Sequence, residues 1–218
     1  MLLAAMQDRL SSLYETPIEH RVMDYLVTDA RIADALEQAA TPRANAERLL
    51  LRQSEDSLDV ALYIDTRIME ALADLDPHTC LDARNLNDFL TALEGVSHFN
   101  YLVWNALHER QVTQLELELQ AEIDKYVVAT MLLDEQGTAA DADHFHTAMF
   151  TFVVFDPDLD APAEQRYRDA NHYAAKYCRR LTRQFPAQHR EPSFINELRR
   201  FYRLSRNDKI RCIDNGVA

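Results

Sequence analysis

Glycine occurs three times in the 218 residues of this chain, at Gly95, Gly137 and Gly216. An average protein contains about 7% glycine. Scarce glycine combined with abundant leucine, alanine, arginine and glutamate favours helices. The same scarcity excludes the glycine-rich loops that bind nucleotide phosphates and the G-x-S-x-G turn that carries a serine nucleophile. The sequence therefore predicts an all-α protein without a nucleotide-binding loop.

The centre of the predicted fold is a pair of long helices at about 85–136. The first, at 85–107, is apolar on nearly all sides, which is typical of a helix inside a bundle. The second starts at Thr113, because Thr113 and Glu116 have the spacing of a capping box, and Gly137 suits the residue after its end. The short connection favours an antiparallel hairpin. We expect a single-domain, multi-helix bundle organised around this hairpin.

Capping signals and apolar spacing predict further helices on both sides of the hairpin. Those before it cover 2–14, 17–39, a segment that starts at Thr41-Pro42 and carries Leu49 to Leu51, and a segment from Ser54 or Ser57 to 75. Those after it start within 139–143 and continue through 155, then cover 162–185, 193–204 and a short stretch from 205. The segment 149–155 has the composition of a strand, but no second clear strand is present to pair with it. We therefore expect a buried helix there.

Charge is distributed unevenly along the chain. Residues 164–218 contain 13 Lys and Arg against 6 Asp and Glu, a net charge of +7, whereas residues 1–163 contain 10 against 30, a net charge of −20. Such asymmetry suits either basic helices docked on acidic ones within one domain or nucleic-acid binding by the basic part. We expect the docked arrangement, with 1–163 as the acidic helices and 164–218 as the basic helices.

Cysteine use and hydropathy predict a cytoplasmic protein. Cys80, Cys178 and Cys212 are far apart and form no C-x-x-C motif, which favours reduced thiols. The first eight residues lack the basic segment of a signal peptide. No uncharged apolar run approaches the ~18 residues that cross a membrane. We expect no membrane association.

Candidate metal ligands lie on the two central helices. Glu94 and His98 are spaced i,i+4 on the first, and Glu118 and Glu122 have the same spacing on the second. Di-iron and di-manganese bundle proteins take Glu from two helices and Glu-x-x-His from two others. A later helix adds His172, but no Glu-x-x-His occurs in this chain. Glu94, His98, Glu118, Glu122 and His172 are therefore the candidate ligands of a metal cofactor.

The alternative interpretation of these polar residues is a buried network that needs no metal. Glu94 would hold His98, while Glu118 and Glu122 would receive Arg or Lys from the basic helix. The cation across the Glu118 and Glu122 pair is left open between Lys125, a distant arginine and a metal. Partners are required in either case, because an unpaired buried charge costs several kcal/mol.

A basic ridge is expected on the helix at 162–185, formed by Arg168, His172, Lys176, Arg179 and Arg183. Interleaved aromatic residues give this ridge the composition of a nucleic-acid interface. At helical spacing such aromatics are more often core residues, and a pI near 5.0 opposes polyanion binding. Nucleic acid is therefore a disfavoured partner.

Three functional hypotheses follow. The first is a non-enzymatic, cytoplasmic interaction or regulatory protein without a cofactor, which binds a protein partner or a second copy of itself, as a homodimer, through a charged helical face. Its basis is that no catalytic triad is recognisable and that Cys178 is expected to point inward. The second is a metal-dependent helical-bundle enzyme of the di-iron or di-manganese kind. The third is nucleic-acid binding through the basic C-terminal helices.

Overall fold

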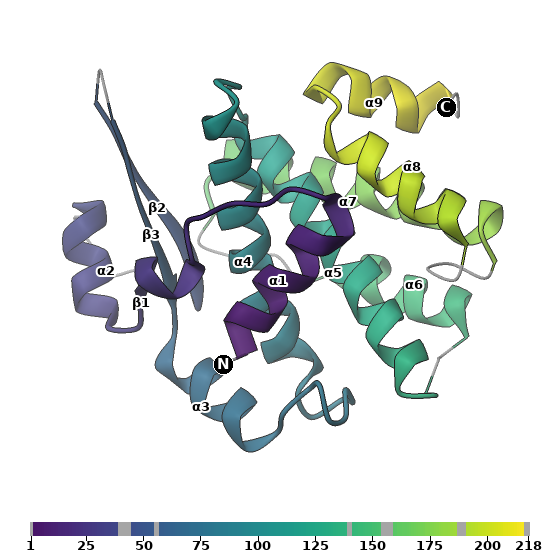
Figure 1. Cartoon of the computed structure of the whole chain (residues 1–218), viewed down its shortest axis with the longest axis horizontal. Coiled ribbons are helices and arrows are strands. Elements are labelled where there is room, and N and C mark those ends of the chain that lie inside the picture. Colours follow the sequence, from purple (N-terminus) through teal and green to yellow (C-terminus); the bar gives the residue numbers. More distant parts are fainter. Residues whose placement is uncertain are drawn as a thin grey trace.

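The computed structural model describes residues 2–38, 45–54, 57–138, 141–153, 159–186 and 191–215. These residues form mostly helices, together with one small sheet (Figure 1). The helices are α1 (Leu2–Tyr14), α2 (Ala30–Glu37), α3 (Thr66–Asp74), α4 (Leu86–Leu107), α5 (Gln114–Glu135), α6 (Ala142–Thr151), α7 (Ala161–Gln184), α8 (Pro192–Tyr202) and α9 (Arg206–Asn215). The strands are β1 (Leu26–Val27), β2 (Glu47–Gln53) and β3 (Leu58–Ile64), and a 3-10 helix, η1, covers Val22–Tyr25.

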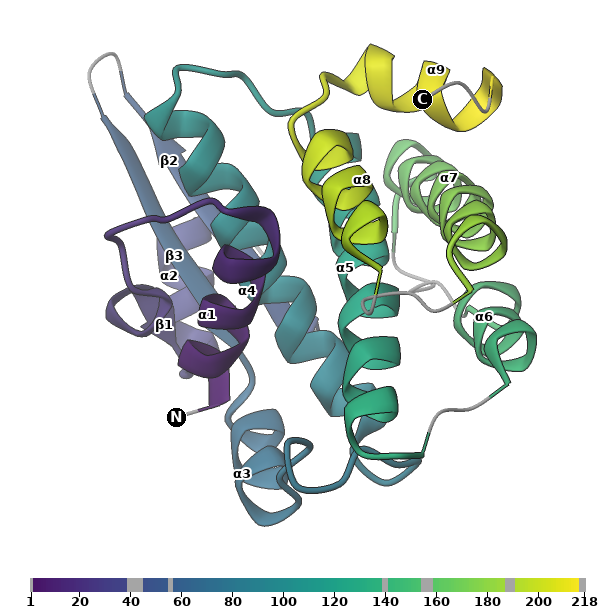
Figure 2. The ribbon, with the colours of Figure 1, turned by 45° about the vertical axis from the view of Figure 1, so that its right-hand side comes forward.

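The two long central helices that the sequence predicts correspond to α4 and α5. Thr113 begins α5 with a complete capping box, since its side chain accepts from the Glu116 backbone and Glu116 accepts from the Thr113 backbone. Helix α5 packs against both α4 and α7, while α1 crosses α4 (Figure 2). One hydrophobic core joins residues of α1 and of α3 through α9, with many of them on α4 and α5, whereas α2 packs in a smaller cluster. These two helices therefore carry the side chains around which the remaining helices pack.

A three-stranded sheet corrects the all-α expectation. Strands β2 and β3 are antiparallel, from Glu47 opposite Ile64 to Gln53 opposite Leu58, and β1 runs parallel to β3 in the order β1-β3-β2. Helix α2 contacts β2 on one side, and α4 contacts β2 and β3 on the other. The helices predicted around Leu49 to Leu51 and from Ser54 or Ser57 to 75 are therefore wrong; only the last part of the second is helical, as α3.

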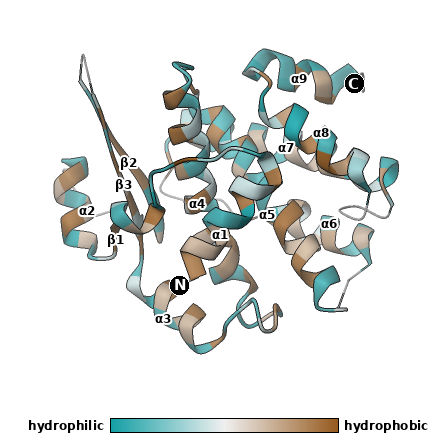
Figure 3. Ribbon diagram, in the orientation of Figure 1, coloured by the Kyte–Doolittle hydropathy of each residue, from teal (hydrophilic) through white to brown (hydrophobic). Residues whose placement is uncertain are grey.

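The sheet was missed because β3 is buried on both faces. Leu62 and Ile64 point into the main core, whereas Tyr63 packs with Leu50 and Ala33 in a smaller cluster under α2. A strand covered on both sides has an almost continuous apolar run, as the colouring of β2 and β3 indicates (Figure 3). Periodicity alone does not distinguish such a run from a buried helix.

Two other predicted helices differ in extent. The segment 17–39 contains η1, β1 and α2 in place of one helix. Helix α6 ends at Thr151, and Phe152 is 75% exposed, so the expected buried helix does not reach that far. Residues 154–155 and the Thr41-Pro42 helix start lie outside the described residues. The helices predicted at 2–14, 162–185, 193–204 and after 205 correspond to α1, α7, α8 and α9.

None of the described helices combines the length and the apolar character that a bilayer-crossing helix needs.

Candidate metal centre

Four of the five predicted metal ligands come together between α4 and α5. Glu94 and His98 share one face of α4, and Glu118 and Glu122 share one face of α5, because i,i+4 residues lie one turn apart. His98 Nε2 lies 3.5 Å from Glu118 Oε2. Lys125 Nζ donates to Glu94 Oε2 at 2.8 Å and to Glu122 Oε1 at 2.7 Å. The polar atoms of the two helices therefore form one connected cluster.

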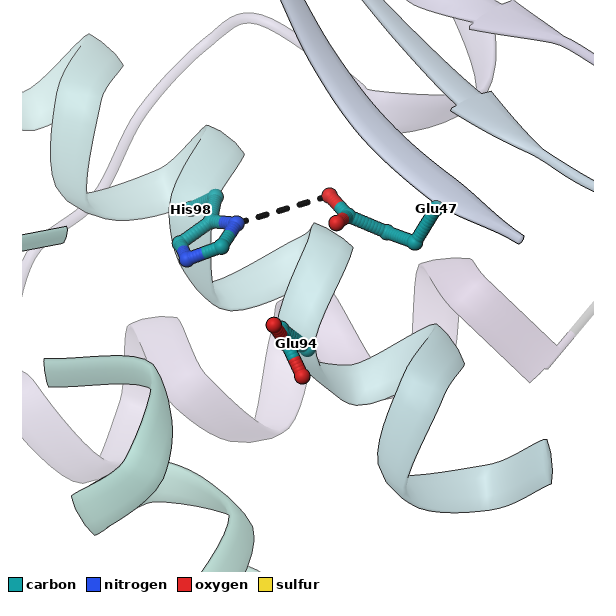
Figure 4. Close-up of side chains that lie close together, drawn as sticks. All are labelled: Glu47, Glu94 and His98. Atoms are coloured by element: carbon teal, nitrogen blue, oxygen red, sulfur yellow. Dashed lines mark hydrogen bonds and ion pairs between the residues drawn. The ribbon is translucent and has the colours of Figure 1, made fainter. Parts of the chain in front are cut away.

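A fifth residue, Glu47 at the start of β2, was missed by the sequence analysis. Its Oε1 lies 3.4 Å from His98 Nδ1 (Figure 4). Ligand atoms of Glu47, Glu94 and His98 all lie within 4.8 Å of one another. Because the sequence predicted a helix in this region, it gave no reason to place Glu47 beside the central helices.

Gly95 provides the room for Glu47 to approach α4. A Cβ at Gly95 would lie 2.9 Å from Glu47 Cγ and 2.9 Å from Leu62 Cδ1, which is closer than such atoms pack. A glycine inside a helix usually has a packing or functional reason. Gly95 was therefore the one sequence signal that pointed to a neighbouring backbone or side chain at this position.

His98 lies between two carboxylates and is only 6% exposed. Nδ1 faces Glu47, while Nε2 faces Glu118 at the limit of hydrogen-bond distance and has no partner of good hydrogen-bond geometry. Burial alone would lower the pKa of His98, but the facing carboxylates of Glu118 and Glu47 raise it well above its usual value. Without a bound metal ion, the imidazole of His98 is therefore held in its positively charged form.

The glutamates repel one another in this confined space. Burial raises the pKa of Glu47, and His98 offsets this only in part. Burial also raises the pKa of Glu122 despite the neighbouring Lys125. For Glu94, burial acts in the same direction, but the positive charges of Lys125 and His98 leave its pKa lowered. Among the described contacts, the four carboxylates of the cluster (Glu47, Glu94, Glu118 and Glu122) therefore face two cations, protonated His98 and Lys125.

The sequence allowed a lysine, an arginine or a metal ion as the cation beside the glutamates of the second central helix. In the structure, Lys125 is that cation. Burial would lower its pKa, but the charges of Glu122 and Glu94 raise it, so the ammonium stays protonated. In the described contacts, the cation facing Glu94 and Glu122 comes from α5 itself and not from the basic helices. That corrects the expectation that arginines of the C-terminal part pair with these glutamates.

Tyr167 of α7 is half-buried. Burial, and after it the negative charges of Glu118, Glu94 and Glu47, raise the pKa of this tyrosine. The Arg166 guanidinium carbon lies 5.5 Å from the Tyr167 ring centroid, and its Nε is buried without a hydrogen bond.

His172, the fifth predicted ligand, lies elsewhere. It is exposed on α7, and its ring is 5.6 Å from that of Tyr173.

The predicted basic ridge is at the surface, and several of its charges are paired within the chain. Arg168 pairs with Glu164 at 2.6 Å and Lys176 with Asp214 at 2.8 Å. Arg179 Nη1 lies 3.7 Å from Asp143, and its Nη2 is 3.1 Å from His146 Nδ1. His172 and Arg183 are exposed. The ridge therefore presents less net positive charge than its sequence suggests.

A second buried polar cluster lies on another face of α5. Asp124 accepts hydrogen bonds from Tyr14 and Ser97, both at 2.5 Å, and from Gln120 at 2.8 Å. Lys209 of α9 is fully buried and donates to Gln120 Oε1 at 2.7 Å. Its Nζ also lies 4.4 Å from the Tyr101 ring centroid and 5.1 Å from that of Phe201. These residues come from α1, α4, α5, α8 and α9, so no local spacing in the sequence groups them.

Comparison of the chain with protein-family models, with curated protein sequences and with solved structures finds no significant match.

Proposed function

We propose that this protein binds one divalent transition-metal ion, Mn²⁺ or Fe²⁺, through Glu47, Glu94 and His98. The observation that carries the proposal is the convergence of these three side chains from β2 and α4, with ligand atoms within 4.8 Å of one another. Carboxylates suit Mn²⁺, and imidazole suits iron and zinc, so a mixed set with more oxygen than nitrogen favours Mn²⁺ or Fe²⁺.

The dimensions of the cluster suit one ion. Two oxygen ligands on opposite sides of a Mg²⁺-sized ion lie about 4.2 Å apart. The three ligand atoms lie within 4.8 Å of one another, so modest rotation of the flexible glutamate side chains would bring them to the separations that ligands of one ion have. Glu118, 3.5 Å from His98 Nε2, is placed to accept a hydrogen bond from the imidazole when Nδ1 binds the ion. A carboxylate in that place fixes the tautomer and the orientation of a metal-binding histidine.

Charge balance also favours an ion. Four carboxylates faced by protonated His98 and Lys125 leave an excess of two negative charges among the described contacts. A divalent ion would replace the histidine proton and add two positive charges, which reduces the excess to one. A metal ligand must be deprotonated, so binding would release that proton.

Metal-dependent chemistry is the function that this geometry supports best, in agreement with the second hypothesis from the sequence. Three protein ligands leave coordination positions for water or a substrate, and an ion in that setting polarises oxygen atoms or activates bound water. We also propose a cytoplasmic location, which suits the free thiols of Cys80, Cys178 and Cys212.

The test is metal titration of the purified protein under anaerobic conditions, followed by electron paramagnetic resonance for Mn²⁺ and elemental analysis for both metals. We expect the wild-type chain to bind one ion. Glu47→Gln and His98→Gln should each weaken binding by at least about tenfold, since each removes a ligand. Glu164→Gln is the matched control, because Glu164 pairs with Arg168 at the surface. A wild-type chain that binds neither metal, or ligand variants that bind as tightly as the control, would contradict the proposal.

A second candidate function is self-association through an apolar surface on α2 and the β2–β3 hairpin. Leu36 and Leu51 are exposed and border one pocket together with Leu50, Val60 and Ala61. Leu51 and Leu58 also line a neighbouring pocket whose other walls are largely polar, from Gln53 to Arg110. Exposed contiguous apolar surface marks interaction sites, so the homodimer expected from the sequence would use an apolar face and not a charged one. Light scattering tests this: a dimer that dissociates in Leu51→Asp supports it, and a monomeric wild-type chain contradicts it.

A further inference from the structure

Lys125 holds a position that a second metal ion takes in two-metal sites. Its ammonium bridges Glu94 Oε2 at 2.8 Å and Glu122 Oε1 at 2.7 Å, and its side chain is 12% exposed. In two-metal centres the ions lie about 3.5–4 Å apart and are bound by carboxylates that project from facing helices. Glu94 lies between the two cation positions here, because it belongs both to the group with Glu47 and His98 and to the ion pair with Lys125.

We propose that Lys125 occupies the second cation position of this carboxylate cluster, so that the protein takes a single divalent ion and becomes a two-ion site when the ammonium is removed. This inference rests on the proposed function, because it concerns the same cluster. It differs from that proposal in assigning the residue that limits the cluster to one ion and in expecting a second ion when that residue is replaced.

The arrangement of the two helices supports this assignment. Glu118 and Glu122 are spaced i,i+4 on α5, and Lys125 follows Glu122 by three residues, so its side chain lies on the same face. From there it reaches Glu94 on α4. Without the ammonium, Glu94 and Glu122 would face each other as like charges across the space it leaves, with Glu118 beside them. Two or three carboxylates around one small volume form a donor set for a second hard divalent ion.

The experiment compares Mn²⁺ stoichiometry in the wild-type chain, in Lys125→Met and in Lys176→Met. Methionine keeps much of the lysine volume without its charge. Lys176 also pairs with a carboxylate, Asp214, but at the surface, so it is the matched control. Native mass spectrometry counts the ions, and electron paramagnetic resonance distinguishes an isolated Mn²⁺ ion from a coupled pair. We expect one ion in the wild-type chain and in the control, and two coupled ions in Lys125→Met.

Each other outcome has a defined meaning. One ion in the wild-type chain and one or none in folded Lys125→Met overturns the inference and leaves the proposed function in place. Two ions in the wild-type chain also overturn the inference alone. No ion in the wild-type chain contradicts both. If Lys125→Met fails to fold, Lys125→Gln retains a hydrogen-bond donor for the glutamates, and the wild-type stoichiometry remains a decisive measurement in itself.

Discussion

Gly95 is a residue at which helix propensity and site geometry oppose each other. Gly95→Ala would ordinarily stabilise a helix interior by about 1 kcal/mol. Here the new Cβ would lie 2.9 Å from Glu47 Cγ, so Glu47 must move away from His98. We therefore expect Gly95→Ala to show no such increase in the free energy of unfolding, measured with urea. We also expect it to bind Mn²⁺ at least about tenfold more weakly than the wild-type chain. Thr91→Ala, on the same helix, is the control. Undiminished Mn²⁺ affinity in Gly95→Ala would show that Glu47 does not need this space.

Lys209 gives the stability of the protein a pH dependence that can be assigned to one residue. Burial lowers its pKa to about 7, an effect that Glu116 and Asp124 oppose and Arg110 reinforces. The unfolded chain, with a pKa near 10.5, binds this proton more tightly than the folded chain does. The stability that this residue contributes is therefore fully present above about pH 10.5 and is lost progressively as the pH falls from there to about 7.

We expect Lys209 to contribute a rise in unfolding free energy of up to about 1.4 kcal/mol per pH unit between pH 7 and 9, while His98, whose pKa is raised, contributes a slope of the opposite sign. The slope should therefore be lower by the Lys209 contribution in Lys209→Met than in the wild-type chain, and unchanged in Lys176→Met. Urea unfolding at several pH values measures it. Equal slopes in all three proteins would show that Lys209 is not the titrating residue.

Among the elements, α5 begins with the most complete end signal. Thr113 Oγ1 accepts from the Glu116 backbone, and Glu116 accepts from the Thr113 backbone at 2.9 Å. Thr113→Ala removes one of these bonds, and loss of such a cap typically costs about 1 kcal/mol. We expect a decrease of that size in unfolding free energy, measured in urea. Thr91→Ala, which leaves both ends of α4 and α5 intact, should change it much less. Equal decreases in unfolding free energy in both variants would show that the cap stabilises the protein no more than the Thr91 side chain does.

The predictable part of the fold is the part governed by local signals. Caps and 3.6-residue spacing located α1, α4, α5, α7 and α8, and i,i+4 spacing placed Glu94 with His98 and Glu118 with Glu122. The unpredictable part depends on long-range pairing. β3 is recognisable as a strand only when α2 and α4 are known to cover its two faces. Since Glu47 enters the cluster through β2, the missed sheet and the missed ligand have a single cause.

Across the whole molecule, the end of α1 contacts α8 and the residue that follows it. Arg199 of α8 pairs with Glu15 at 2.7 Å and donates to the Leu13 carbonyl, and Arg203 donates to the carbonyl of Tyr14. Part of the basic charge of the C-terminal region thus faces carbonyl and carboxylate oxygens at the end of α1. Other basic residues pair within their own region, as Lys176 does with Asp214. Both uses reduce the positive charge available to a polyanion.

Polyanion binding should accordingly be weak. We expect the protein to pass through a heparin column at ~50 mM salt, where proteins with several free phosphate-binding cations are retained. Asp214→Asn, which frees Lys176, should add little retention. Strong, salt-sensitive retention of the wild-type chain would restore the nucleic-acid hypothesis.

Glu47 is the first residue of β2, so an ion bound to it would tie the sheet to the central helices. Transient separation of the β2–β3 hairpin from α4 would then require the bond between the ion and the Glu47 carboxylate to break. Hydrogen–deuterium exchange should register this as slower amide exchange at 47–50 when Mn²⁺ is added, with exchange in α9 unchanged. Loading of the ion would thereby slow the exchange of a strand that contributes a single ligand, at its first residue.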